Sequence, residues 1–352
     1  MKLYFAPMEG ITGYVFRNAY AACYGGVDAF FTPFLSNPVL NQIELHDILP
    51  ENNQGIRVIP QILTNRPETF EAIATTLKDY GYPEVNLNLG CPSGTVVAKG
   101  RGAGALREPR TLDRLLYGIF EKSPLPLSVK CRIGIFSEAE WEDILEVLLK
   151  YPMTELIIHP RVQKQFYNGE VHMEAFRTAY RQIITEPFGS AGDEVASHAA
   201  WAAAGDTRGE ASLRLCYNGD IRTPADLSSL MSEYPGVSAV MLGRGLLWDP
   251  ELAERYLKTA AAPDLSKSSD AAAAPDLSKV RVVPDRERLR RFLGLLYDGY
   301  KKEMDREGPA LMKLKELWKY LQVYTGHTPQ EMRPLWKART LPEYRDVVSM
   351  LV

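Results

Sequence analysis

The feature that most constrains the fold is the repeated alternation of short apolar runs with helical segments over the first two thirds of the chain. The runs are almost continuously apolar, which is typical of parallel strands buried on both faces. The expected strands cover residues 3–8, 27–34, 57–63, 84–89, 125–132, 155–159, 213–218 and 237–243.

Helical patterns follow most of these strands, and proline near the start of several of them suits a first helical turn. These helices are expected at 67–80, 109–121, 138–150, 224–233 and 250–258. Strand-then-helix units repeated over about 260 residues predict an α/β fold of the (β/α)8 TIM-barrel type. A doubly wound open sheet is the alternative, but residues 7–13 after the first strand carry no dinucleotide-binding glycine pattern.

Two stretches interrupt this order. Residues 186–212 are rich in small side chains and are interpreted as an insertion within a catalytic domain spanning 1–259. Residues 260–280 contain AAAPDLSK twice and are interpreted as a flexible linker. Beyond it, apolar residues at helical spacing predict a small α-helical domain over 281–352, with Leu314, Leu317, Trp318 and Leu321 in its core.

Charge is divided unevenly along the chain. The whole chain has a formal net charge of −3, which argues against a strongly basic nucleic-acid binder. From residue 281 to the end, however, 15 Lys and Arg face 10 Asp and Glu, a balance of +5 that leaves −8 on the remainder. Such a tail can hold a polyanion at one end of the protein, although a solvated helical face is the plainer interpretation.

Composition sets further bounds. Hydrophobic residues at 45% and charged residues at 24% exclude wholesale disorder. The first residues fit no signal or transit peptide, and no apolar run reaches the roughly 18 residues of a membrane span, so we expect a cytoplasmic protein without membrane contact. The four cysteines lack CxxC spacing, which predicts no metal site and no disulfide framework. Cys23, Cys131 and Cys216 lie within helices or strands and are expected to be packing residues.

Polar residues collect where the expected strands end, which in a barrel is the active-site face. Glycine turns after the last two strands, with Arg244, predict a phosphate site. Gln61 and Asn88 can hydrogen-bond the edge of a flat heterocycle, and Lys130 can balance negative charge on it. Together they predict a phosphorylated flat cofactor, with flavin mononucleotide (FMN) as the leading candidate. The residues at or near the strand ends are Pro7, Met8, Glu9, Gln61, Asn88, Lys130, Arg132, His159, Arg161, Asn218, Gly219, Asp220, Gly243 and Arg244.

Cys91 follows the fourth strand and precedes a glycine-rich basic loop at 93–104. An ordinary thiol, with a pKa of about 8.5, is protonated at neutral pH and can donate a proton; a nucleophile would need a nearby cation to lower its pKa. Both roles stay open on these grounds. Lys99 and Arg101 suit a phosphodiester backbone, as do Arg161 and Lys164, while a mobile lid is the alternative for the loop.

The motifs resemble, in order and spacing, those of the tRNA-dihydrouridine synthases over residues 3 to about 250. They read APMEGITGYVFR, NLNLGCPSGTVVAKGRGAGAL, SVKCRIG, IIHPRVQKQFYNG, CYNGDI and MLGRG. The resemblance implies that NADPH reduces FMN, that the flavin passes hydride to C6 of a uracil in tRNA, and that a cysteine protonates C5. It also implies that the helical C-terminal domain recognises RNA, and we expect a monomer.

Carried over by position, the resemblance makes Cys91 the proton donor. Asn88, Lys99, Arg101, Arg161 and Lys164 would contact the RNA, and Gln165 and Tyr167 match the segment after the histidine. Gly13, Asn86 and Pro160 stand where the family commonly has Asp, Asp and Gly. The residues that would hold FMN are Pro7, Met8, Glu9, Gln61, Lys130, His159, Asn218, Gly219, Asp220, Gly243 and Arg244.

Three other functions remain open on the sequence. An FMN barrel acting on a free pyrimidine, such as dihydroorotate, would not need the basic tail or the Lys99 and Arg101 loop. An aldolase using Lys130 as a Schiff base would bind no flavin. A non-catalytic RNA-binding protein is disfavoured because Cys91, Lys130 and His159 are all present.

Overall fold

The computed structural model describes residues 1–186, 213–261 and 283–352. The chain divides into two compact units, each made of segments that are distant in sequence. The first unit comprises Met1–Pro7, Ala29–Asp220 and Tyr234–Met241, and the second comprises Met8–Asp28, Ile221–Glu233 and Leu242–Val352. In the part of the chain that is described, no helix is both long and apolar enough to cross a membrane.

The first unit is built on a closed barrel whose parallel strands neighbour one another in sequence order, so the predicted (β/α)8 barrel is confirmed. The observed strands lie within about three residues of the expected bounds. They are β1 (Lys2–Phe5), β2 (Ala29–Leu35), β3 (Val58–Ile62), β4 (Val85–Leu89), β5 (Leu127–Arg132), β6 (Glu155–His159), β7 (Arg214–Tyr217) and β8 (Ala239–Leu242).

The barrel interior is filled by apolar side chains, as a packed barrel core requires. Its members come from β1 and the residue after it, and from β2, β3, β6, β7 and β8: Tyr4, Ala6, Ala29, Phe31, Ile59, Ile157, Cys216, Ala239 and Met241. Near the start of the strands, Glu155 is buried and accepts a hydrogen bond from the Tyr4 hydroxyl at 3.3 Å. Because burial disfavours the charged carboxylate, the pKa of Glu155 is raised. In barrels of this kind the active site lies at the carboxyl ends of the strands.

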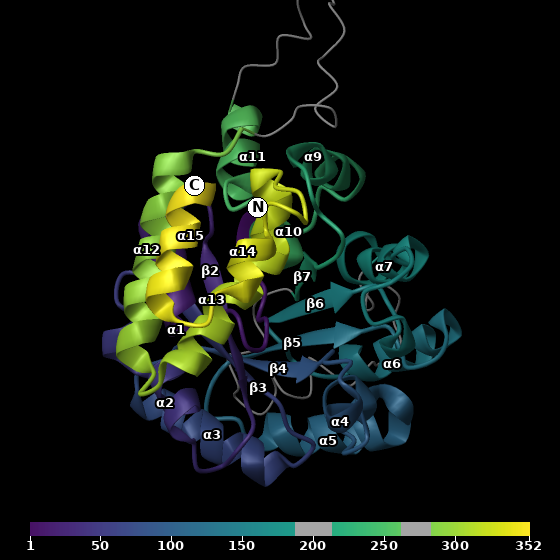
Figure 1. Cartoon of the computed structure of the whole chain (residues 1–352). Coiled ribbons are helices and arrows are strands. Elements are labelled where there is room, and N and C mark those ends of the chain that lie inside the picture. Colours follow the sequence, from purple (N-terminus) through teal and green to yellow (C-terminus); the bar gives the residue numbers. More distant parts are fainter. Residues whose placement is uncertain (187–212, 262–282) are drawn as a thin grey trace, which may run out of the picture. The chain divides into compact units, whose positions relative to one another are not determined.

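Helices of the first unit lie outside the strands, α3, α5 and α6 among them (Figure 1). Proline begins α3 and α5, as the sequence predicts, because its fixed φ angle suits a first turn. The helices are α2 (Gln42–Ile48), α3 (Pro67–Asp79), α4 (Gly94–Val97), α5 (Pro109–Lys122), α6 (Trp141–Leu149) and α7 (Met173–Tyr180).

The second unit is helical, and in it the C-terminal helices α12, α13 and α15 lie side by side (Figure 1). Helix α1 packs on α12, where the Phe16 and Phe292 rings meet edge to face with centroids 5.7 Å apart. Leu314, Leu317, Trp318 and Leu321 are buried, as predicted. The helices are α1 (Tyr14–Cys23), α9 (Pro224–Glu233), α10 (Arg244–Trp248), α11 (Leu252–Ala261), α12 (Arg286–Glu303), α13 (Glu307–Thr325), α14 (Arg333–Lys337) and α15 (Leu341–Leu351).

The domain boundaries predicted from the sequence stay a prediction. The expected linker at 260–280 lies, apart from its first two residues, outside the described part of the chain, and so does the expected insertion at 186–212, apart from Glu186. The helices that the sequence assigns to a C-terminal domain do not form a compact unit by themselves. Helices α1, α9, α10 and α11, which precede them in the chain, belong to the same unit.

Candidate active site

A chain of amide side chains crosses the ends of strands β3 to β5. Gln61 donates from Nε2 to Asn86 Oδ1 at 2.7 Å, and its Oε1 accepts from Asn88 Nδ2 at 2.7 Å. Asn86 in turn donates to the Ser128 hydroxyl at 2.9 Å. All four side chains are buried, and buried amides hold a fixed orientation when their polar atoms are paired. Gln61 and Asn88, both expected site residues, are therefore brought together.

Asn88 also orients the loop that carries Cys91. Its Oδ1 accepts hydrogen bonds from the backbone N–H groups of Gly90 and Cys91, each at 2.9 Å. Cys91 is the one partly exposed cysteine of the chain, whereas Cys23, Cys131 and Cys216 are buried as predicted. Burial raises the pKa of Cys131 to about 12, which keeps that thiol protonated and inert. Among the four, Cys91 is the thiol that a substrate can reach.

The glycine-rich segment after Cys91 folds back onto it. Gly102 has a φ angle of 55°, and a Cβ there would approach the Cys91 Cβ and carbonyl oxygen to 2.9 Å, so only glycine fits. The Ala103 amide donates to the Cys91 carbonyl at 3.1 Å. Val97 and Ala103 are buried together with Ile135. The segment is thus packed against the barrel, while Lys99 remains exposed and Arg101 is partly exposed.

Lys130 lies on β5 in register with Asn88. Desolvation by the surrounding protein, together with the smaller effect of the neighbouring Arg132, lowers the pKa of its ammonium group to about 8. Within the described residues, no carboxylate is among the groups that influence this pKa. A partly buried lysine without a carboxylate counter-ion is suited to an anionic ligand.

The Lys130 environment predicts a rise in stability with pH. Lysine in the unfolded chain keeps its proton up to a pKa of 10.5, but in the folded protein it loses it at about 8. Between these values the unfolded state binds more protons, so raising the pH favours the folded state. We expect the ligand-free wild type to gain stability relative to Lys130→Met between pH 7 and pH 9.5 in urea unfolding. Parallel pH profiles of the two proteins would contradict the lowered pKa.

Arg132, which the sequence places at a strand end without a function of its own, links the cysteine loop to the loop after β6. Its guanidinium donates to three carbonyls: from Nε to Gly90 at 3.0 Å, from Nη1 to Val162 at 3.0 Å and from Nη2 to Phe166 at 2.6 Å. The side chain is buried, and desolvation lowers its pKa to about 10. Its spacing of two from Lys130 places both on one face of β5, which is the sequence signal that could have indicated this role.

Arg161 occupies a different position from the one expected of an RNA-contacting residue. Its side chain is fully buried and pairs through two contacts with Asp220, one of them at 3.0 Å. It also donates to the Gly169 carbonyl at 2.5 Å and approaches His159 Nε2 to 3.3 Å. Since a guanidinium only donates, His159 Nε2 is the acceptor and its proton lies on Nδ1. Burial leaves Arg161 no surface for a phosphate, so we assign it to positioning His159 and Asp220.

The loop after β7 is held close to the barrel. Asn218 is buried and donates from Nδ2 to the Met241 carbonyl at 2.8 Å. At Gly219 a Cβ would lie 2.0 Å from the Tyr217 hydroxyl, so any other residue would displace that ring. Through Arg161, Asp220 is connected to His159.

The remaining expected cofactor residues, Pro7 excepted, belong to the second unit. Met8 and Glu9 precede α1, and Gly243 and Arg244 begin α10 directly after β8. Two guanidinium groups flank the Trp248 ring, that of Arg244 at 5.2 Å and that of Arg222 at 4.9 Å from its centroid. Arg222 is a cation that the sequence motifs did not single out.

The family model and the curated relatives point to one family. The family model described as "Dihydrouridine synthase (Dus)" matches residues 4–184 and 190–283. A probable tRNA-dihydrouridine synthase of Staphylococcus epidermidis is 27% identical over 264 residues, which cover 74% of this chain and 73% of the relative. The probable tRNA-dihydrouridine synthase 2 of Bacillus subtilis is 29% identical over 266 residues, with the same coverage. Among solved structures, morphinone reductase aligns at 12% identity with a TM-score of 0.47, covering 75% of this chain and 88% of that one.

Proposed function

Since the chain belongs to the dihydrouridine synthase family, we propose that it is an oxidoreductase that reduces uridine in tRNA to 5,6-dihydrouridine with FMN and NADPH. The observation that carries the proposal is the family match over most of the chain. The reachable Cys91, on a loop oriented by Asn88 at the carboxyl ends of the strands, supports it. Such an enzyme works in the cytoplasm on folded tRNA, as a monomer.

The residues of the first unit fit a flavin. Gln61 and Asn88 hold each other in place behind the cysteine loop, and Lys130 offers a partly exposed cation with no carboxylate partner among the groups that shift its pKa in the described residues. Such a donor set suits a flat ring that carries negative charge. When bound, FMN supplies the hydride that originates from NADPH. Within the second unit, Gly243 and Arg244 would serve its phosphate, as the sequence motifs predict.

Cys91 is the residue that provides a proton in this proposal. The Asn88 side chain fixes the backbone of Gly90 and Cys91, and the backbone of Gly102 packs closely against Cys91. The thiol is therefore held in one place, where it can donate its proton to C5 of the uracil while C6 receives hydride. A stacked uridine does not expose these carbons, so the base must leave its stack to react.

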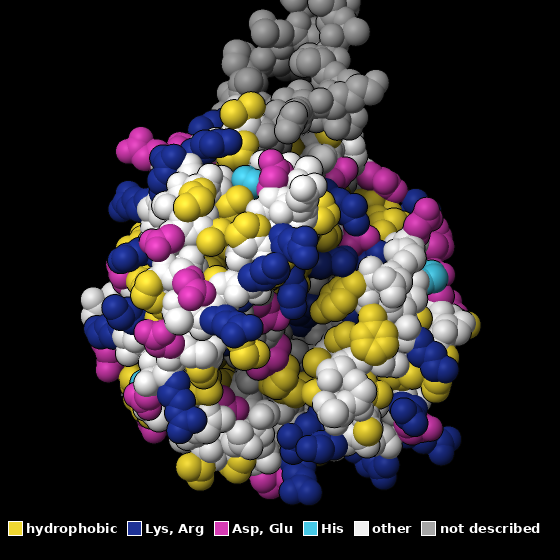
Figure 2. Space-filling model, in the orientation of Figure 1, with side chains coloured by type: hydrophobic (Ala, Val, Ile, Leu, Met, Phe, Trp, Pro, Cys, Tyr) yellow, Lys and Arg dark blue, Asp and Glu magenta, His cyan; other side chains and the backbone are white. Residues whose placement is uncertain are grey.

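The RNA is held mainly through phosphates in this proposal. In the first unit Lys99 and Lys164 are exposed near the cysteine loop and the loop after β6. In the second unit, Figure 2 shows Lys and Arg side chains gathered over the region of α14, whose neighbourhood includes exposed Arg333, Lys337 and Arg339. A folded RNA recognised by shape needs such separate cationic contacts.

Nucleoside mass spectrometry of tRNA tests the proposed function. Cells that lack the gene are expected to lose a uridine derivative two hydrogens heavier at a mapped tRNA position, and a plasmid copy is expected to restore it. A plasmid copy carrying Tyr117→Ala, a change on the exposed face of α5, serves as the matched control. An unchanged dihydrouridine content, with purified protein that also fails to reduce tRNA, would favour a free pyrimidine as substrate.

A further inference from the structure

Three aromatic rings are exposed on the loops that follow β5 and β6. Phe136 is 57% exposed, Phe166 is 44% exposed and Tyr167 is 49% exposed. Figure 2 shows hydrophobic side chains at the surface where these strands end. A single exposed ring is ordinary in proteins, but several on adjacent loops mark a surface that binds something.

The two loops form one rigid support because they continue the parallel pairing of β5 and β6 beyond the sheet. The Ile133 amide donates to the Arg161 carbonyl at 3.3 Å, and the Gln163 amide donates to the Gly134 carbonyl at 2.9 Å. At the following position the Lys164 amide donates to the Ile135 carbonyl at 3.1 Å. The exposed rings are therefore presented by a fixed backbone, so their ordering adds little entropic cost when a ligand binds.

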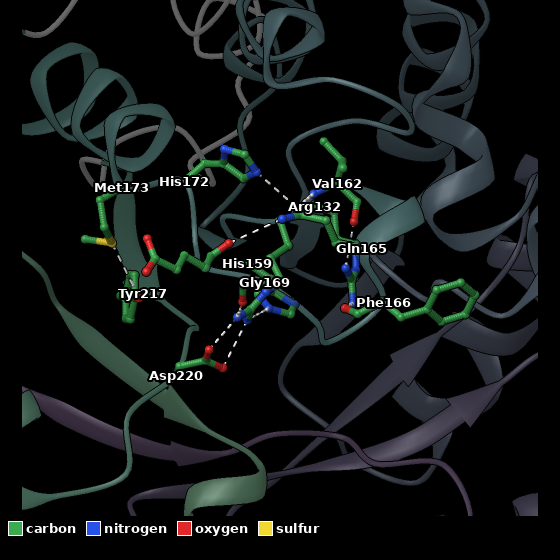
Figure 3. Close-up of polar contacts among 12 residues, drawn as sticks. Arg132, His159, Val162, Gln165, Phe166, Gly169, His172, Met173, Tyr217 and Asp220 are labelled. Atoms are coloured by element: carbon green, nitrogen blue, oxygen red, sulfur yellow. Dashed lines mark hydrogen bonds and ion pairs between the residues drawn. The ribbon is translucent and has the colours of Figure 1, made fainter.

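Phe166 is held in an unfavourable backbone conformation. Its φ angle is 51°, and it is the one residue other than glycine with positive φ in the described chain. A bulky residue in that region is strained, and the strain persists only where neighbours over-determine it. Arg132 Nη2 donates a hydrogen bond to the Phe166 carbonyl at 2.6 Å. The Phe166 amide donates to the Gln163 carbonyl at 3.0 Å. The ring extends away from the polar network (Figure 3).

A cation accompanies the rings. The Lys164 ammonium lies 4.5 Å from the centroid of the Phe136 ring. Exposed rings interleaved with lysine are the chemistry of single-stranded nucleic-acid binding, in which bases stack on the rings and the cation meets a phosphate. The same support reaches the cysteine loop, since Gln163 Nε2 donates to the Pro92 carbonyl at 2.8 Å.

We propose that Phe136 and Phe166 are stacking residues for the nucleobases that flank the uridine extruded for reduction, with Lys164 on the phosphate between them. Extrusion opens the stack on both sides of the missing base, and aromatic rings can replace the contacts that the neighbours lose. This inference rests on the proposed function and adds two substrate-binding residues to it. The rings would hold the open strand beside Cys91.

The test uses purified full-length protein and an unmodified tRNA transcript. Phe136→Ala removes one ring, and Phe166→Gly removes the other while relieving the positive φ, so the fold is retained. Tyr117→Ala, an exposed aromatic on α5 that is 53% exposed, is the matched control, and Phe136→Trp is the conservative variant. The readouts are the dissociation constant for tRNA, the rate of flavin bleaching by NADPH, and the dihydrouridine formed.

We expect each ring-removing variant to weaken tRNA binding by about 5- to 100-fold, as for the loss of one base–aromatic stack. Flavin bleaching by NADPH stays unchanged, and Tyr117→Ala and Phe136→Trp bind tRNA as the wild type does. Unchanged tRNA affinity in both variants would overturn the inference, as would slower bleaching alone, which would place the nicotinamide on these rings. Wild-type protein that neither binds nor reduces tRNA would instead overturn the proposed function.

Discussion

Replacing Cys91 with alanine is expected to reduce dihydrouridine formation by about 100- to 10,000-fold, because a positioned general acid contributes that much to a rate. The thiol is the only one of the four that is partly exposed, and its backbone is fixed by the Asn88 side chain. The same change leaves Gln61, Asn88 and Lys130 in place, so the purified variant should stay yellow. Single-turnover reduction of a tRNA transcript, followed by mass spectrometry, measures the loss.

Cys23→Ala is the matched control for this change. It also removes one thiol, but from helix α1, where the side chain is buried. It should keep full activity with tRNA. If Cys91→Ala reduced tRNA at the wild-type rate, another group would have to be the proton donor; if it lost its yellow colour, Cys91 would instead support the flavin.

Removing the Asp220 carboxylate is expected to destabilise the first unit by about 3 kcal/mol, because it leaves the Arg161 cation buried without its partner. The Arg161 side chain is wholly buried, whereas that of Asp220 is 29% exposed, so the cost falls on the arginine. Urea unfolding of Asp220→Ala against the wild type measures the effect.

A double variant separates the cost of an unpaired buried charge from the cost of altered packing at Arg161 and Asp220. Arg161→Met combined with Asp220→Ala removes both charges and should recover much of the lost stability, since an apolar replacement leaves no unpaired charge. Its activity should stay low, because His159 loses the Arg161 contact at 3.3 Å. Equal stability of Asp220→Ala and the wild type would show that water reaches the Arg161 guanidinium.

Periodicity predicted the barrel because each strand is buried on both faces and is bounded by turn residues. Strand β6 begins and ends where the sequence predicts, since Glu155 and His159 are both drawn into the sheet. Motif spacing likewise brought Gln61 and Asn88 together, because neighbouring parallel strands end at one edge of the barrel.

Side-chain burial was not predictable in the same way. Arg161 and Lys164 are both cations after β6, yet one is buried against Asp220 and the other is exposed. The backbone path of the loop after β6 decides which of these two side chains is buried and which is exposed. The exposure of Phe136 and Phe166 was missed for a related reason, since an aromatic residue in a loop is expected to pack inward.

The composite second unit has a consequence for synthesis on the ribosome. Helix α1 is synthesised well before its partner α12, because the strands of the barrel lie between them in the sequence. Until then the rings of Phe16, Tyr20 and Tyr24, which all meet Phe292 in the finished unit, have no cover from it. The nascent chain therefore carries these apolar rings without their partner while the barrel strands are being made, an interval in which exposed apolar surface favours aggregation.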